Sequence, residues 1–301
     1  MIRVNDHKSM SYCLIDSGNG YRLEKVGNNV LARPDSTCVW NRQYDDRVWD
    51  LVHAVFQKKS NGRNSWAMKN ELKEPWLFHY TLPKGDHLVK KITCQLRMSP
   101  GSKNVGIFPE QVWHWDYISN ILSNSTPGAK VLNLFGYTGA GTLVAAASGA
   151  EVCHVDSSKS SVEWAKENQH LSKLDDAPIR WIVDDCLTFL KREIKRGNKY
   201  DGIILDPPAF GHDPRGKKFT FEEQIHPLLE ACSQLLSKKQ LFMIVNAYAM
   251  NYAPSVTANL LNQYFKQDVI QYGTLDLETE SGLYTVSCNA FARFTSLAQG
   301  E

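Results

Sequence analysis

The stretch Val131–Gly141, VLNLFGYTGAG, constrains the fold more than any other part of this sequence. An apolar run ends in glycines, and an alanine-rich segment that favours a helix, Thr142–Ser148, comes directly after it. This order predicts a β-strand, a tight turn and the start of a helix. Glycine lets the backbone approach a ligand closely, and the free N–H groups at a helix start attract polar groups. Ordinary strand-to-helix turns also use glycine, so a ligand-binding role for this turn needs support from the residues at the other strand ends.

The remainder of the second half alternates between strand-like and helix-like segments. Such alternation predicts an α/β fold with a doubly wound, mostly parallel sheet. The last two strands are joined by Asp276–Gly282 without a helix, which indicates an antiparallel hairpin at one sheet edge. The expected strands are Val131–Phe135, Glu151–Asp156, Ile179–Asp184, Tyr200–Asp206, Gln240–Val245, Val269–Tyr272 and Tyr284–Arg293. The expected helices are Thr142–Ser148, Ser158–Ser172, Cys186–Arg196, Phe221–Leu236 and Ser255–Lys266.

Residues 1–98 have a different pattern and predict a small β-rich N-terminal domain, with a second domain over residues 99–301. Short strands are expected from Tyr12, at Tyr21–Val26 and at Asn29–Arg33, with glycine turns between them. Apolar residues at helical spacing predict a helix over Asp45–Lys58. Two further strands are expected at Trp76–Leu82 and Val89–Arg97. Three roles for this lobe stay open from sequence: binding nucleic acid, orienting a substrate, or covering the second domain.

Composition places the chain among ordinary globular proteins, with 43% hydrophobic and 22% charged residues. The net charge of +2 permits a nucleic-acid partner without requiring one. An apolar run of membrane-spanning length and an apolar signal core are both absent from the sequence. The seven cysteines are scattered without a CxxC pair, which argues against a disulfide scaffold and against a zinc site. We therefore expect a reduced, cytoplasmic protein without a bound metal.

Three acidic positions stand at the ends of predicted strands, where ligands bind in such sheets. Asp156 ends the second strand and can accept hydrogen bonds from ribose hydroxyls, although it or Ser158 can instead cap the next helix. Asp185 can accept a bond from an adenine amino group, or can serve only as a helix cap. The fourth strand ends in Asp206-Pro207-Pro208-Ala209-Phe210, where two prolines stop the ladder and fix a rigid set of acceptor groups. Phe210 is available to stack on a flat ring.

Together these segments resemble the class I methyltransferases, Rossmann-like enzymes that use S-adenosylmethionine. LFGYTGAG, the Asp156 strand end, DDC and DPPAF occur along the chain in the order expected for that class. The likeness is greatest to the bacterial 23S ribosomal RNA cytosine-C5 methyltransferases and their uncharacterised relatives, and GIFPEQ (residues 106–111) resembles the segment that covers the cofactor there. The resemblance implies S-adenosylmethionine as cofactor. It assigns the acceptor side to Asp206, Pro207, Pro208 and Phe210. It assigns the cofactor side to Gln111, Asn133, Phe135, Gly136, Tyr137, Thr138, Gly139, Asp156 and Asp185.

The residues after the fifth strand depart from the cytosine-C5 pattern. That reaction needs a cysteine thiolate to activate the ring, and in those enzymes the cysteine comes after the fifth strand. Here Asn246-Ala247-Tyr248 takes its place, and Cys153, Cys186 and Cys288 are interpreted as inert residues. We therefore expect methyl transfer to a lone pair, at a ring nitrogen, an amino group or an oxygen, with Asp206 and the Pro207 carbonyl holding the acceptor.

The loop after the prolines carries Arg215, Lys217 and Lys218, which suit contacts to RNA phosphates. A methyltransferase acting on RNA, with ribosomal RNA as first choice, is the function the sequence favours. Two rivals stay open: methylation of a protein or small molecule, and a cofactor-binding RNA assembly protein without catalysis. The base, the atom and the oligomeric state are not indicated.

Overall fold

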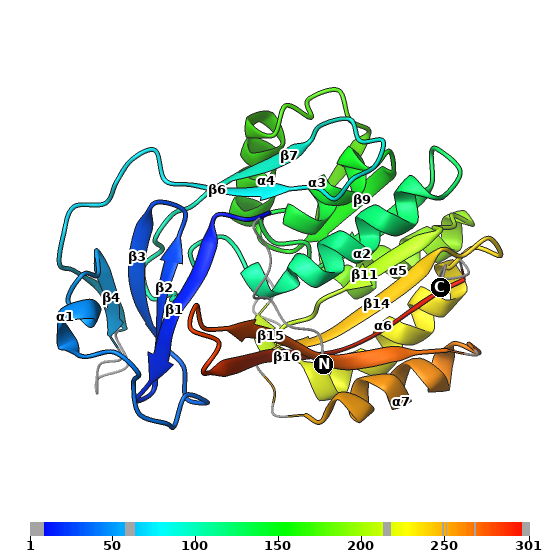
Figure 1. Ribbon diagram of the computed structural model, residues 1–301. Helices are drawn as coiled ribbons and strands as arrows, with labels where there is room; N and C mark the ends of the chain where they lie inside the picture. The colour runs from blue at the N-terminus through cyan, green and yellow to red at the C-terminus, as the bar shows by residue number, and fades with distance from the viewer. Residues whose placement is uncertain are drawn as a thin grey trace.

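The computed structural model describes residues 9–57, 64–212, 218–248, 250, 252–267 and 269–296 (Figure 1). A seven-stranded sheet in the order β10-β9-β8-β11-β14-β16-β15 forms the centre of the C-terminal part. Neighbouring strands from β10 to β14 pair in parallel, and β16 runs antiparallel to both β14 and β15. This confirms the predicted doubly wound, mostly parallel sheet with an antiparallel edge. The strands are β8 (Lys130–Leu134), β9 (Glu151–Asp156), β10 (Ile179–Val183), β11 (Gly202–Leu205), β14 (Phe242–Tyr248), β15 (Gln271–Glu278) and β16 (Thr285–Thr295).

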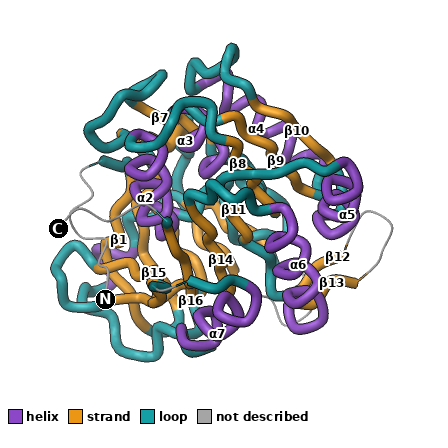
Figure 2. Tube along the Cα trace, turned by 90° about the vertical axis from the view of Figure 1, so that its right-hand side faces the viewer, coloured by secondary structure: helices purple, strands orange, loops and turns teal. Residues whose placement is uncertain are grey.

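Helices cover both faces of this sheet, which explains why its central strands are apolar on both sides. Val131 packs in the cluster that contains α2 and α3, whereas Leu132 and Leu134 pack in the cluster formed with α5, α6 and α7. Figure 2 shows the central strands between these two layers. The helices are α2 (Val112–Ser123), α3 (Ala140–Ala147), α4 (Lys159–Leu171), α5 (Cys186–Arg196), α6 (Phe221–Leu235) and α7 (Pro254–Tyr264).

The ends of these elements are set by local chemistry. Ser158 caps α4 by accepting from Ser161 N, and Asp185 caps α5 by accepting from Thr188 N. Gly197 ends α5 with φ of +73°, the left-handed conformation that favours glycine. The five helices predicted in this half are confirmed, whereas α2 and the short 3₁₀ helix η1 (Pro109–Gln111) were not predicted.

The predicted boundaries were wrong at two strands. Strand β14 runs on to Tyr248, so that Asn246 and Ala247 lie within it rather than after it. Strand β15 includes Asp276–Glu278, which the sequence pattern places in the connecting loop. A bulge between Leu275 and Asp276 lets that strand continue, and burial of Leu275 and Leu277 stabilises the extension.

The N-terminal sheet has the strand order β1-β2-β3-β4-β5. Its strands are β1 (Tyr12–Gly18), β2 (Tyr21–Val26), β3 (Asn29–Pro34), β4 (Ala54–Gln57) and β5 (Ser65–Met68). The prediction of one helix over Asp45–Lys58 was wrong: α1 covers only Asp46–Trp49. Phe56 is buried and packs edge-on against Trp66 of β5 at 5.2 Å, so strand pairing outweighs the helical spacing here. Lys58 lies outside the described residues.

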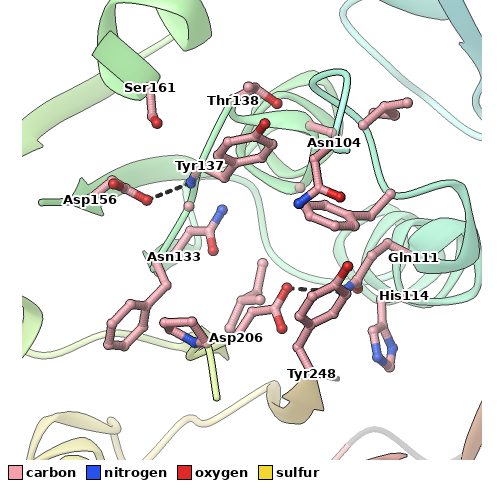
Figure 3. Close-up of a pocket in the computed structure, with 18 of the residues that line it drawn as sticks. Asn104, Gln111, His114, Asn133, Tyr137, Thr138, Asp156, Ser161, Asp206 and Tyr248 are labelled. Atoms are coloured by element: carbon pink, nitrogen blue, oxygen red, sulfur yellow. Dashed lines mark hydrogen bonds between the residues drawn. The ribbon is translucent and has the colours of Figure 1, made fainter. Parts of the chain in front are cut away.

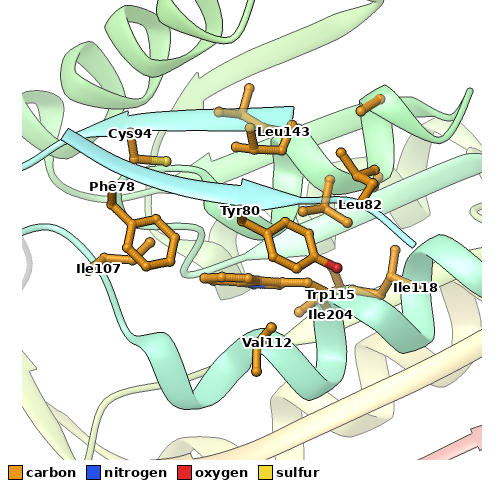
Figure 4. Packing of buried hydrophobic residues seen from close by; sticks show 14 of the residues in the cluster. Phe78, Tyr80, Leu82, Cys94, Ile107, Val112, Trp115, Ile118, Leu143 and Ile204 are labelled. Atoms are coloured by element: carbon orange, nitrogen blue, oxygen red, sulfur yellow. The ribbon is translucent and has the colours of Figure 1, made fainter. Parts of the chain in front are cut away.

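A separate hairpin, β6 (Leu77–Thr81) and β7 (Lys91–Gln95), confirms the two strands predicted there and lies against α2, α3 and α4 (Figure 1). Tyr80 packs on Trp115 of α2 with the rings 5.2 Å apart (Figure 4). Asn168 of α4 accepts from Gln95 N at 2.8 Å and donates to Thr138 O at 2.9 Å. This asparagine therefore connects the hairpin to the glycine-rich turn. The expected domain boundary at residue 98 stays a prediction.

None of the helices in the described part of the chain is long and apolar enough to cross a membrane.

Candidate active site

A cavity of about 370 Å³ opens at the carboxyl ends of β8, β9, β11 and β14 (Figure 3). This is the edge where the strand order reverses between β8 and β11, the position at which doubly wound sheets bind ligands. The predicted residues that line the cavity are Gln111, Asn133, Phe135, Gly136, Tyr137, Thr138, Asp156, Asp206 and Pro208. The sequence therefore identified much of one continuous site from segments far apart in the chain.

The glycine-rich turn forms the first wall. Phe135 and Tyr137 have positive φ of 58° and 49°, and Gly139, which begins α3, has φ of +86°. A Cβ on Gly136 would lie 2.4 Å from His154 Cε1, so only glycine fits there. Thr138 Oγ1 donates to Gly106 O at 2.6 Å and thereby holds the 106–111 segment against the turn.

Asn133 stands beneath this turn in a buried set of polar groups. Its Nδ2 donates to Thr142 Oγ1 at 2.8 Å, and this hydroxyl lies 2.9 Å from His154 Nδ1. Burial lowers the pKa of His154 to about 3, so the imidazole is neutral. The set fixes the direction of the Asn133 amide at the cavity wall.

Asp156 has two roles at once in this structure. Its Oδ2 accepts from Tyr137 N and its Oδ1 accepts from Ser158 N, each at 2.8 Å. Burial raises the pKa of its carboxyl, and the two backbone bonds oppose that rise. The residue therefore stabilises both the turn and the start of α4 while lining the cavity, and the capping and ligand roles are compatible.

Four predicted site residues are not among those that line the cavity. Asp185 accepts from Thr188 N at 2.8 Å as the cap of α5. Gly139 begins α3, and Pro207 comes directly after Asp206 in the chain. Phe210 is 76% exposed in the short strand β12 (Phe210–His212), which pairs with β13 (Lys218–Thr220). Their proposed roles at the cofactor and acceptor stay predictions.

Asp206 occupies the opposite wall. Its Oδ2 accepts from Gln111 Nε2 at 2.9 Å, whereas its Oδ1 is buried without a hydrogen-bond partner among the described residues. Burial raises the pKa of this carboxyl to about 7; the Asn246 amide opposes the rise and the charge of Glu110 adds to it. A carboxyl with a pKa near neutrality and one unused oxygen is suited to binding or accepting a proton.

A directed series of hydrogen bonds runs behind Asp206. Arg293 Nη1 lies 3.2 Å from His114 Nδ1, and His114 Nε2 lies 2.9 Å from Asn246 Oδ1. Because an arginine can only donate, His114 accepts at Nδ1 and donates from Nε2. Asn246 Nδ2 in turn donates to Gln111 Oε1 at 3.4 Å, which turns the Gln111 amide N–H toward Asp206.

The same series explains the charge states of its members. Burial, with the neighbouring Arg293 charge, lowers the pKa of His114 to about 3 even though the bond to Asn246 opposes this. Burial also lowers the pKa of Arg293 to about 10, which leaves it charged at neutral pH. A buried cation is thus linked through three neutral groups to the Asp206 carboxyl.

Several lining residues were not identified from sequence, among them Asn104, Phe108, His114 and Tyr248. The Phe108 ring lies 5.5 Å from that of Tyr137 and 5.0 Å from that of Tyr248, so these three lining residues pack together. The sequence signal that could have located His114 is the helical spacing of Val112, Trp115, Ile118 and Leu122, all buried in α2.

The cysteines near the site do not resemble nucleophiles. Cys153 and Cys186 are buried, and burial raises the pKa of both thiols. Cysteine is not among the described residues that line the cavity. Within the described ranges, no group of three His, Cys, Asp or Glu side chains is placed to hold a metal ion.

The fold and the site define a class of α/β proteins with a doubly wound sheet. In this class a glycine-rich turn follows the first strand of the sheet, here β8, and lies near an acidic residue at the end of another strand. The crystal structure of the S-adenosylmethionine-dependent methyltransferase from Agrobacterium tumefaciens is 34% identical to this chain, with a TM-score of 0.85. The match covers 99% of this chain and 94% of that protein. The chain therefore belongs to the S-adenosylmethionine-dependent methyltransferases.

Other comparisons match parts of the chain or its fold. The family described as Conserved hypothetical protein 95 matches residues 116–260. A methyltransferase structure complexed with SAH is 21% identical with a TM-score of 0.68, covering 95% of this chain and 76% of that one, and shows the fold alone. Ribosomal RNA large subunit methyltransferase K/L from Colwellia psychrerythraea is 35% identical over 34% of this chain. The matched segment spans only 15% of the length of that protein.

Proposed function

We propose that this protein transfers the methyl group of S-adenosylmethionine to a nitrogen of an RNA base, with ribosomal RNA as the first candidate. The observation that carries the proposal is the buried, unpartnered Oδ1 of Asp206, a residue that lines the same cavity as the glycine-rich turn. RNA as the acceptor is supported by the curated relatives, which are named as ribosomal RNA methyltransferases. The closer relation to cytosine-C5 enzymes stays a prediction.

The residues present fit the cofactor. The turn offers backbone that only glycine allows at residue 136, and Asp156 presents a half-buried carboxylate at the next strand end. Asn133, Gly136, Tyr137 and Thr138 would hold its methionine and ribose side, and Asp156 its ribose hydroxyls. When bound, S-adenosylmethionine supplies an electrophilic methyl group and leaves as its demethylated thioether.

The acceptor is placed by the opposite wall. Asp206 Oδ1 accepts a hydrogen bond from the acceptor N–H and so orients the nitrogen lone pair toward the methyl carbon. As the new N–C bond forms, this proton passes to the Asp206 carboxylate, whose pKa of about 7 suits the transfer. Gln111 keeps the carboxylate in place through its bond to Oδ2.

The raised pKa values of the cysteine thiols support an acceptor atom that attacks through its own lone pair. Methylation at cytosine C5 requires a thiolate, and burial raises the pKa of Cys153, Cys186 and Cys288 away from that state. The cationic loop proposed for phosphate contacts is only partly described: Lys218 is exposed in β13, and Arg215 and Lys217 lie outside the described residues.

The test is transfer of tritiated methyl from S-adenosylmethionine to total RNA, with and without ribonuclease. We expect ribonuclease-sensitive label, and nucleoside mass spectrometry of RNA from a strain lacking the gene should show one methylated nucleoside missing. Label that resists ribonuclease would move the acceptor to protein or a small molecule. Tight cofactor binding without any transfer would favour a non-catalytic assembly protein.

A further inference from the structure

A second cavity, of about 520 Å³, adjoins the first. Tyr248, at the end of β14, lines both cavities, so the two are neighbours. The second cavity lies between the N-terminal sheet, through Arg22 and Pro34, and strands β15 and β16, through Thr274 and Asn289. It is therefore placed to receive a molecule that reaches Asp206 from the side of the N-terminal region.

Asn289 is the feature of this cavity that needs an explanation. The residue is 3% exposed, and both its Oδ1 and its Nδ2 are buried without a hydrogen-bond partner among the described residues. It stands opposite Tyr248 in the β14–β16 pairing and shares a sheet face with Phe291 and Arg293. Leaving a buried donor and acceptor unpaired is costly, and native proteins rarely do so without a ligand or a role.

The charges around the cavity are balanced. Arg22 Nε lies 3.3 Å from Asp35 Oδ2, and Arg22 Nη1 lies 3.9 Å from Glu24. Lys103 Nζ donates to Pro34 O at 3.1 Å, and burial lowers the pKa of this amine. Glu110 is buried as well, and burial raises its pKa. Arg22 Nε makes no hydrogen bond among the described residues, but Asp35 and Glu24 offset the charge of this side chain. The cavity therefore suits a neutral, hydrogen-bonding group better than a phosphate.

Three aromatic side chains form part of the remaining wall. Trp40, Tyr248 and Tyr252 line the cavity from three different segments of the chain. Aromatic faces stack on flat rings of any sequence, and a carboxamide offers a donor and an acceptor in one plane. The donor and acceptor of a carboxamide match the polar edge of a nucleobase. Enzymes that modify bases read this edge once the base has left its helix.

We propose that the second cavity is a nucleobase subsite in which the Asn289 carboxamide reads the polar edge of a base of the acceptor RNA. This rests on the proposed RNA function and extends it, because it assigns recognition of the acceptor to the β16 edge. In this proposal Asn289 does not contact the glycine-rich turn that would hold the cofactor. We therefore expect cofactor binding not to depend on Asn289.

The experiment uses Asn289→Leu, which removes both polar atoms at similar volume, with Asn124→Leu, at the exposed end of α2 and outside both cavity linings, as the matched control. We expect the acceptor KM of Asn289→Leu to rise by about five- to a hundredfold, the discrimination given by one bidentate contact. S-adenosylhomocysteine affinity by calorimetry and the melting temperature should be unchanged or higher, because an unpaired buried amide has been removed. A merely structural Asn289 would instead lower the melting temperature and cofactor affinity together, which overturns the proposal.

A second measurement separates this inference from the proposed function. The four nucleoside 5′-monophosphates are added at millimolar concentration to the S-adenosylhomocysteine-loaded protein, and binding is detected by saturation-transfer NMR. At least one should bind to the wild type and lose its signal in Asn289→Leu. Binding that is equal in both proteins, or no binding of any of the four, rejects the subsite. If the subsite is rejected but the protein still methylates RNA, the proposed function stands. If a nucleotide binds through Asn289 but RNA is not methylated, only the assignment of RNA as the methyl acceptor is rejected.

Discussion

Gln111 donates from Nε2 to Asp206 Oδ2 over 2.9 Å and thereby ties helix η1 to the end of β11. The contact uses one carboxylate oxygen and leaves the other, Oδ1, buried without a hydrogen-bond partner among the described residues. Each residue comes from a separate wall of the site, so the bond also fixes the distance between the walls. Substitutions of Asp206 and of the residues linked to it therefore test the reactivity of the site.

Replacing Asp206 with Ala should lower methyl transfer by at least about a hundredfold, because the acceptor loses its hydrogen-bond partner and proton acceptor. Binding of S-adenosylhomocysteine, measured by calorimetry, should stay detectable. Asp175→Ala, an exposed carboxylate beside His170, is the control and should retain full turnover. Full turnover in Asp206→Ala would reject the assignment.

The pH dependence of stability should identify the same group. Because burial raises the folded-state pKa of Asp206 from 3.8 to about 7, its stabilising contribution is present below the unfolded value and is lost as pH rises through 7. Asp206→Asn should therefore raise the melting temperature relative to wild type at pH 8 and change it little at pH 4. In wild type, kcat should rise with pH through about 7, since transfer needs the carboxylate. A melting-temperature difference of equal size at both pH values would contradict this.

Asn246→Asp tests the hydrogen-bond series behind Asp206. The change removes the N–H donated to Gln111 Oε1 and places a second carboxyl near Asp206, so the Asp206 pKa should move above 7. The ascending limb of the activity profile should shift toward higher pH. Asn124→Asp, at the exposed end of α2, provides the matched control. An unshifted profile would show that the series does not act on Asp206.

Asp156→Ala should weaken S-adenosylhomocysteine binding by about tenfold or more, because a charge-assisted bond to ribose is lost. Ser158→Ala removes the cap of α4 at the cavity wall; it should lower stability by about 1 kcal/mol and weaken cofactor binding less than Asp156→Ala does. Calorimetry and thermal unfolding on both variants separate the binding role from the capping role. Equal losses of affinity in the two variants would assign Asp156 to capping alone.

Gly139→Ala and Gly149→Ala form a matched pair for the turn. Both glycines have positive φ, +86° and +89°, but a Cβ on Gly139 would lie 2.9 Å from Ala165 Cβ, whereas nothing lies within 4 Å of one on Gly149. Gly149→Ala should cost about 1 kcal/mol of unfolding free energy from backbone strain alone. Chemical denaturation should show a clearly larger loss for Gly139→Ala.

The features predicted best from sequence are those that local patterns determine. Apolar runs ending in Asp156 and Asp206 located two strand ends, and the glycines located the turn between β8 and α3. His114 and Tyr248 were missed because their place in the site depends on contacts across the chain, such as the bond from His114 to Asn246, 132 residues away. The same cause explains the false helix at residues 45–58, where pairing with β3 and β5 determines the local structure.

Asn168 holds the β6–β7 hairpin and the glycine-rich turn with a single side chain. A fragment that starts after the hairpin would keep every residue of the turn but would leave the Asn168 carbonyl oxygen without its donor, Gln95 N. It would also remove the Tyr80 ring that packs against Trp115, and would leave Trp164 Nε1 without its acceptor, Gln95 O. The shortest fragment that we expect to fold and keep its activity therefore begins upstream of β6, within the region that the sequence assigns to the N-terminal domain.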